Sequence, residues 1–153
     1  SENGINADMV SLEAFDYLHE PKFDAKRKPV DMQDLRLVFA GNMGGKQQFL
    51  YDLDTLDKGN YHVDLYGVGF KPEKVHNADD TKLNYIGKFP ADEVIDRIDG
   101  DFGIVWYGDS LDSCDCPNGQ YLKYNNPHKL SLYLLCEMPI IIWDKAAMAD
   151  LCC

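Results

Sequence analysis

The spacing of apolar residues changes repeatedly along the chain, and this constrains the fold more than any other sequence feature. Short apolar or alternating runs, typical of strands, end at or near glycines and loops. Segments with apolar residues at helical spacing separate them. The predicted strands are 35–40, 61–66, 83–87, 102–106 and 140–143, and the predicted helices begin near Gly44, Pro90, Pro127 and Asp144. This alternation predicts an α/β fold, a Rossmann-like parallel sheet with helices on both faces.

Prolines and one aspartate mark the limits of the later helices. Pro127 opens a helix and Pro139 breaks it, after a polar loop over 108–120. Asp144 is expected to cap a final helix. The apolar residues expected on these helices are Val94, Ile95 and Ile98 after Pro90, Leu130, Leu134 and Leu135 after Pro127, and Ala146, Ala147 and Leu151 after Asp144.

Composition and charge restrict the partners. The net charge is −11, and the single basic run is at 26–28, so nucleic acid is disfavoured. Because acidic bulk repels phosphate at long range, a phosphorylated ligand needs local dipoles and a few well-placed cations. No apolar run is long enough for a transmembrane segment and no signal peptide is visible. A cytoplasmic location is therefore expected.

The cysteines do not predict a metal site. There are five of them, scattered, with no Cys-x-x-Cys pair. Zinc sites usually need about four ligands in paired clusters. Reduced thiols in a cytoplasm are the simpler interpretation, and we expect no metal.

Both ends of the sequence look unfinished. We interpret 1–28 as the tail of a preceding N-terminal domain and a linker, with one predicted strand at 9–12. Residues 29–153 then form the Rossmann-like domain. Its last helix stops at Cys153 with no closing element, so we expect a truncated C-terminus.

Three loops that follow predicted strands have compositions suited to a ligand, since open parallel sheets bind ligands beyond the carboxyl ends of their strands. The loop 41–46 is rich in glycine and ends in Lys46, but its spacing does not match a P-loop. The loop 66–69 lacks the third glycine of a dinucleotide fingerprint. The loop 106–110 combines aromatic and carboxylate groups that suit a sugar. Ordinary structural turns remain the alternative for all three.

The fourth loop, Tyr-Asn-Asn-Pro-His-Lys at 124–129, carries the most specific signal. Lys129 falls in the first turn of the helix that Pro127 opens, where the helix dipole disfavours a cation. A bound pyrophosphate would reverse that penalty by pairing with the lysine and the free N–H groups. The alternative is an Asn-capped helix with solvated His128 and Lys129.

The remaining motifs give no supported functional site. Asp52-Leu53-Asp54 has the Asp-x-Asp pattern of some metal-dependent transferases, but it falls on a predicted helix, where a solvated face is the simpler interpretation. No nucleophile elbow or Cys/His pairing at a known spacing occurs, so hydrolase chemistry has no candidate nucleophile.

The segments 121–129, 131–134 and 139–147 closely resemble the C-terminal domain of the bacterial glucosyltransferase and galactofuranosyltransferase-like enzymes that glycosylate serine-rich adhesins. The resemblance extends over nearly the whole chain and includes 39–42 and 66–67. It implies one half of a two-domain GT-B transferase, whose C-terminal domain binds a nucleotide sugar, typically UDP-glucose, without a metal. The implied partners are the UDP-sugar and a glycan or glycoprotein acceptor, with homo-oligomer formation through the full-length enzyme left open.

The resemblance also assigns roles to residues. It places the diphosphate at Asn42, Lys46, Asn126, His128 and Lys129, the base or ribose at Tyr66 and Gly67, and the sugar at Tyr107, Asp109, Tyr124 and Asn125. Many GT-B enzymes bind ribose through a helical Glu, but Ser131 and Leu132 stand near that place here. The ribose contact is therefore unassigned, and no catalytic base is named in this chain. A non-catalytic nucleotide-sugar-binding or assembly module is the alternative function.

Overall fold

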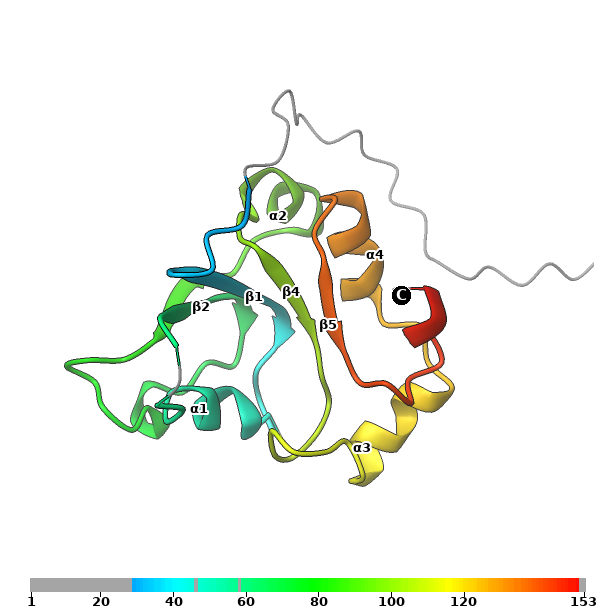
Figure 1. Ribbon diagram of the computed structural model, residues 1–153, viewed down its shortest axis with the longest axis horizontal. Coiled ribbons are helices and arrows are strands. Elements are labelled where there is room, and N and C mark those ends of the chain that lie inside the picture. The colour runs from blue at the N-terminus through cyan, green and yellow to red at the C-terminus, as the bar shows by residue number, and fades with distance from the viewer. Residues whose placement is uncertain (1–28, 46, 58, 152–153) are drawn as a thin grey trace, which may run out of the picture.

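The computed structural model describes residues 29–45, 47–57 and 59–151 (Figure 1). The strand expected at 9–12, the assignment of 1–28 to a preceding domain, and Lys46 lie outside the described residues. In the part of the chain that is described, no helix is long and apolar enough to cross a membrane.

Five parallel strands form one sheet in the order β3-β2-β1-β4-β5, which confirms the Rossmann-like α/β prediction. The sequence order reverses between β1 and β4, at the centre of the sheet. The strands are β1 Leu35–Asn42, β2 Tyr61–Val68, β3 Leu83–Gly87, β4 Phe102–Val105 and β5 Ile140–Ile142.

The helices are short. They are α1 Phe49–Leu53, α2 Ala91–Arg97, α3 Pro117–Gln120 and α4 His128–Leu135, with single 3-10 turns η1 Pro72–Lys74, η2 Tyr121–Lys123 and η3 Ala149–Leu151. The helix α3 lies inside the segment expected to be a plain loop. It begins there because Pro117 suits a first helical turn and the Cys116 sulfur accepts a hydrogen bond from the Gly119 N–H at 3.3 Å.

The prediction of a final α-helix after Asp144 is wrong. The chain there forms turns that lead into η3. In an α-helix the Ala147 N–H would donate to the Trp143 carbonyl, but it donates instead to the Leu122 carbonyl at 2.8 Å. The Trp143 carbonyl accepts from Ala146, which closes a tight turn at 3.0 Å. A hydrogen bond to a segment distant in the sequence therefore replaces the hydrogen bond that an α-helix would form.

The core has two parts, one on each face of the sheet. Side chains alternate along β1, so Val38 joins the cluster that includes Ile95 of α2 and Leu130 of α4. Phe39 joins the opposite cluster, which contains Leu50 of α1. Helices thus contribute to the core on both faces of the sheet, as predicted (Figure 1).

One buried position on α4 was predicted wrongly. Leu134 is 40% exposed, whereas Tyr133 is fully buried against the sheet. The ring of Tyr133 lies over Gly103 of β4 so closely that a Cβ added to this glycine would come within 2.4 Å of ring carbons. Glycine at this position therefore makes room for the tyrosine ring.

Gly103→Ala should lower the free energy of unfolding by about 2–3 kcal/mol, because the added methyl group overlaps the Tyr133 ring and neither the central strand nor the buried ring can move freely. Urea denaturation of the two proteins measures this difference. A loss below about 0.5 kcal/mol, the range of ordinary surface substitutions, would contradict the packing described.

Candidate functional site

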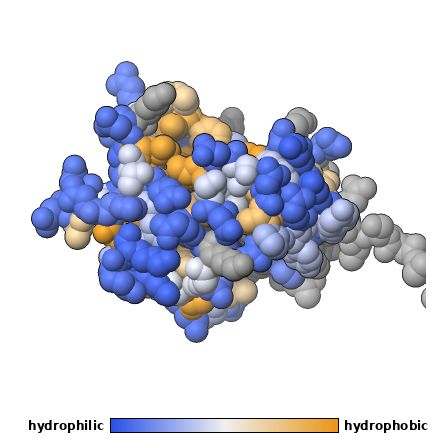
Figure 2. Space-filling model, turned by 90° about the horizontal axis from the view of Figure 1, so that it is seen from below, coloured by the Kyte–Doolittle hydropathy of each residue, from blue (hydrophilic) through white to orange (hydrophobic). Residues whose placement is uncertain are grey.

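A pocket of about 700 Å³ lies at the carboxyl ends of β1, β2 and β4 and beside the first turns of α2 and α4. It adjoins the place where the strand order reverses between β1 and β4, the usual ligand position in open parallel sheets. Viewed from below in Figure 2, the molecule has a mostly hydrophilic surface with a smaller apolar area.

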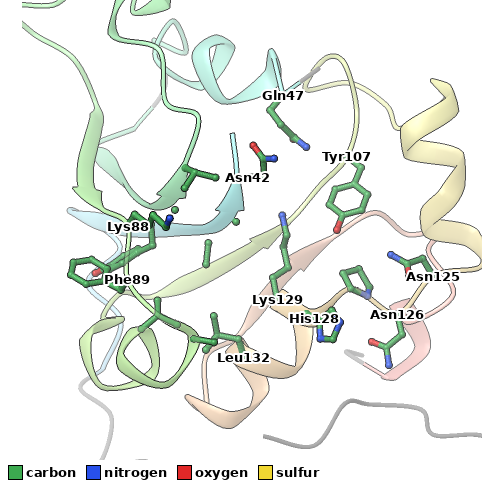
Figure 3. A pocket seen from close by; sticks show the side chains of 18 of the residues that line it. Asn42, Gln47, Lys88, Phe89, Tyr107, Asn125, Asn126, His128, Lys129 and Leu132 are labelled. Atoms are coloured by element: carbon green, nitrogen blue, oxygen red, sulfur yellow. The ribbon is translucent and has the colours of Figure 1, made fainter. Parts of the chain in front are cut away.

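The pocket brings together residues from all four loops that the sequence singled out. The predicted site residues that line it are Asn42, Tyr66, Gly67, Tyr107, Asn125, Asn126, His128 and Lys129. Figure 3 shows the Lys129 side chain in the middle of the pocket, between Asn42 and Tyr107 on one side and Leu132 on the other. Their assigned roles stay predictions, but their common location is a structural fact.

Two predicted sugar-binding residues do not line this pocket. Tyr124 is 85% exposed, and Asp109 is also exposed. The family resemblance assigned them to the sugar, but in this chain both side chains are exposed outside the pocket lining. Lys46 lies outside the described residues, so its predicted contact stays untested.

Sequence reasoning missed a fifth loop. Lys88 and Phe89 follow β3 and line the pocket, and Ala91 and Val94 at the start of α2 line it too. The signal was present, because Pro90 marked a helix start directly after a predicted strand. The rule that selected the other four loops would also have selected this one.

The loop after β1 is fixed by close backbone contacts. A Cβ added to Gly67 would lie 1.9 Å from the Gly41 carbonyl oxygen, so only glycine fits where these two strand ends meet. The Met43 N–H donates to the Val68 carbonyl at 2.7 Å. The Asn42 side-chain oxygen accepts from the Gly44 N–H at 2.8 Å, which shapes the turn beside the pocket.

Lys129 occupies an unusual environment for a lysine. Its ammonium nitrogen lies 3.8 Å from the centre of the Phe39 ring and 4.9 Å from that of Tyr107. Among the described residues, no carboxylate lies within ion-pair distance of it. The residue is half-buried overall, and desolvation by burial lowers the pKa of Lys129 to about 7.

The pocket lining has no acidic side chain among the described residues, although the chain carries 26 Asp and Glu. The first turn of α4 also lacks an acidic residue, and Pro127 at its N-cap position offers no side-chain acceptor. A helix N-terminus attracts negative charge. The pocket therefore combines a buried amine with a positive helix end and excludes carboxylates, an arrangement suited to an anionic ligand.

The described residues contain no group of three or more His, Cys, Asp or Glu side chains placed to hold a metal ion. Cys114 is buried, which raises the pKa of its thiol, and the Cys116 sulfur is engaged by the turn of α3. The expected independence from a metal stays a prediction.

Comparison with known proteins identifies the family of this chain. Residues 37–152 match the family model described as the glucosyltransferase 3-like C-terminal domain. The chain is 38% identical over 145 residues to the beta-1,6-galactofuranosyltransferase WbbI of Escherichia coli (strain K12). That match covers 93% of this chain but 39% of the relative. No solved structure gives a significant match. The chain belongs to the glucosyltransferase 3-like C-terminal domain family.

Proposed function

We propose that this chain is the donor-binding part of a glycosyltransferase and that its pocket binds a UDP-sugar. The observation that carries the proposal is Lys129, a half-buried amine beside two aromatic rings without a described carboxylate partner, in a pocket whose described lining has no acidic residue. Such a group is costly in the free protein, and a bound anion would offset the cost. The family and the galactofuranosyltransferase relative support a nucleotide sugar as that anion.

In this proposal the diphosphate lies against Lys129 and the first turn of α4. Asn42, Asn126 and His128 line the same pocket and would supply further hydrogen bonds. The start of a helix and a lysine together make a common phosphate site in proteins.

The sugar and the base would lie on opposite sides of the diphosphate. Tyr107 and Asn125 border the pocket on the side of β4 and α4, where an aromatic face and an amide suit a hexose. Tyr66 and Gly67 border it on the side of β2, and the Tyr66 ring packs against Phe89 at 6.3 Å. The half-buried Phe89 thus adds an apolar wall for the base to the residues that the sequence predicted.

The chemistry would be transfer of a hexosyl group to an acceptor hydroxyl. The bond between the anomeric carbon and the diphosphate oxygen breaks, and the acceptor oxygen forms a new bond to that carbon. Negative charge grows on the leaving diphosphate, where protonated Lys129 would stabilise it. The galactofuranosyltransferase relative is much longer than this chain, so acceptor binding and deprotonation are assigned to no residue here.

The two comparisons point to different sugars, a glucosyl and a galactofuranosyl group. We therefore propose a UDP-hexose as donor. The glycan acceptor on a protein is proposed from the resemblance to the enzymes that glycosylate serine-rich adhesins. The increase in melting temperature produced by UDP-glucose and by UDP-galactofuranose, each compared with UDP, identifies the sugar, because ligand binding to the native state raises its stability.

A non-catalytic nucleotide-sugar-binding module is the second candidate. It is favoured by the absence of a carboxylate among the described residues that line the pocket, since a carboxylate is a common general base. Turnover of a UDP-hexose by the chain joined to an acceptor-binding part supports the transferase. Tight UDP-sugar binding without transfer in that longer protein supports the module.

Lys129→Met should remove about half or more of the stabilisation by UDP. At a free UDP concentration of about 100 times Kd, the wild type should gain about 2.7 kcal/mol, seen as a higher melting temperature. The variant should show at least a tenfold weaker Kd, roughly the loss of one charged hydrogen bond. Lys123→Met is the matched control, because the Lys123 ammonium also lies over an aromatic ring, that of Trp143, but outside the pocket. Equal effects of the two substitutions would refute the assignment.

The same pair of variants tests the low pKa of Lys129 without any ligand. The folded protein holds this amine neutral above about pH 7, whereas the unfolded chain keeps it protonated up to about pH 10.4. The unfolded state therefore binds more protons in this window, and wild-type stability should rise with pH relative to Lys129→Met. Urea denaturation at several pH values measures the difference. A flat difference would show that the amine is not buried.

A further inference from the structure

The central strands β1 and β4 pair over a short distance. Their register contains Leu37 opposite Phe102 and Val38 opposite Gly103, and it stops there. In contrast, β1 pairs with β2 along its whole length, from Leu35 to Asn42. The strands β1 and β4 therefore separate at the point where the pocket begins.

The hydroxyl of Tyr133 occupies the gap between them. It accepts a hydrogen bond from the Ala40 N–H at 2.8 Å and lies 3.3 Å from the Val38 carbonyl and 3.4 Å from the Ile104 carbonyl. These three backbone groups would otherwise be available for the next step of the β1–β4 ladder. A side chain from α4 thus replaces a strand-to-strand contact in the middle of the sheet.

Lys129 lies one helical turn before Tyr133 on α4, so the two side chains share a face of the helix. Its ammonium reaches between the two strand ends. A Cβ added to Gly41 of β1 would lie 3.5 Å from the Lys129 nitrogen, and the Tyr107 ring, beyond β4, lies on the other side at 4.9 Å. The Lys129 ammonium and the Tyr133 hydroxyl therefore both lie where β1 and β4 separate.

We propose that Tyr133 is a positioning residue, whose hydroxyl holds β1 and β4 apart and so places Lys129 where a bound diphosphate would meet it. This inference rests on the proposed function of the pocket. Tyr133 does not line the pocket and would not touch the ligand. It acts through the backbone of β1, since Ala40 directly precedes Gly41 and Asn42 at the pocket wall.

Tyr133→Phe tests the role of the hydroxyl, with Tyr51→Phe as the matched control. The Tyr51 hydroxyl accepts from the Lys71 N–H at 2.9 Å and its side chain is also buried, but it lies in the core on the opposite face of the sheet. Both substitutions remove one acceptor of a backbone N–H. By calorimetry, Tyr133→Phe should raise the Kd for UDP at least about tenfold, and Tyr51→Phe by less than about threefold. Equal changes would overturn the inference.

A double-mutant cycle separates positioning from general destabilisation. Lys129→Met should weaken UDP binding by more than about tenfold in the wild-type and Tyr51→Phe backgrounds, but by less than about threefold in the Tyr133→Phe background. An undiminished effect of Lys129→Met in the Tyr133→Phe background would show that Tyr133 does not act through Lys129, and would overturn the inference.

Two further outcomes are informative. If the wild type binds no UDP, the proposed function fails, and this result is distinct from a wild type that binds while the cycle shows no coupling. If Tyr133→Phe does not fold, a 3-fluorotyrosine at position 133 keeps the ring and the protonated hydroxyl but weakens the oxygen as an acceptor. That protein should show the same change in Kd in a smaller amount, and an unchanged Kd would overturn the inference.

Discussion

The separation of β1 from β4 after Val38 and Gly103 is the feature on which the site depends. A parallel sheet whose order reverses at its centre leaves a crevice there, because the connections leave toward opposite faces. In this chain the crevice is held by Tyr133, whose hydroxyl bonds to the Ala40 N–H. The absence of a side chain at Gly103 lets the ring approach the sheet.

The same separation explains the electrostatics of the pocket. Lys129 extends from α4 to the ring of Phe39, a residue of the core on the opposite face of the sheet. An amine in that position loses much of its hydration, which lowers its pKa to about 7. Because the described pocket lining carries no acidic group, the protein itself does not neutralise this charge when it forms. A chain with a net charge of −11 thus keeps one local site suited to an anion.

Local sequence patterns predicted the strands and the loops that form the pocket, since strand period and helix starts are properties of short segments. These local predictions were wrong where contacts with residues distant in the sequence determine the structure. Leu134 has the right spacing from Leu130 for a buried face, but the space over Gly103 admits the larger Tyr133. Ala147 leaves the helical pattern because its N–H meets the Leu122 carbonyl. The pKa of Lys129 was equally beyond local patterns, because it depends on burial by segments distant in the sequence.

The most direct test of the account is the number of protons taken up when UDP binds. At about pH 8 the terminal phosphate is already ionised, so it releases or takes up few protons. Lys129 is mostly neutral there in the free protein and should become protonated beside the diphosphate. Calorimetry in buffers of different ionisation enthalpy should therefore show uptake approaching one proton per UDP, absent in Lys129→Met. Binding of UDP without proton uptake would contradict the account.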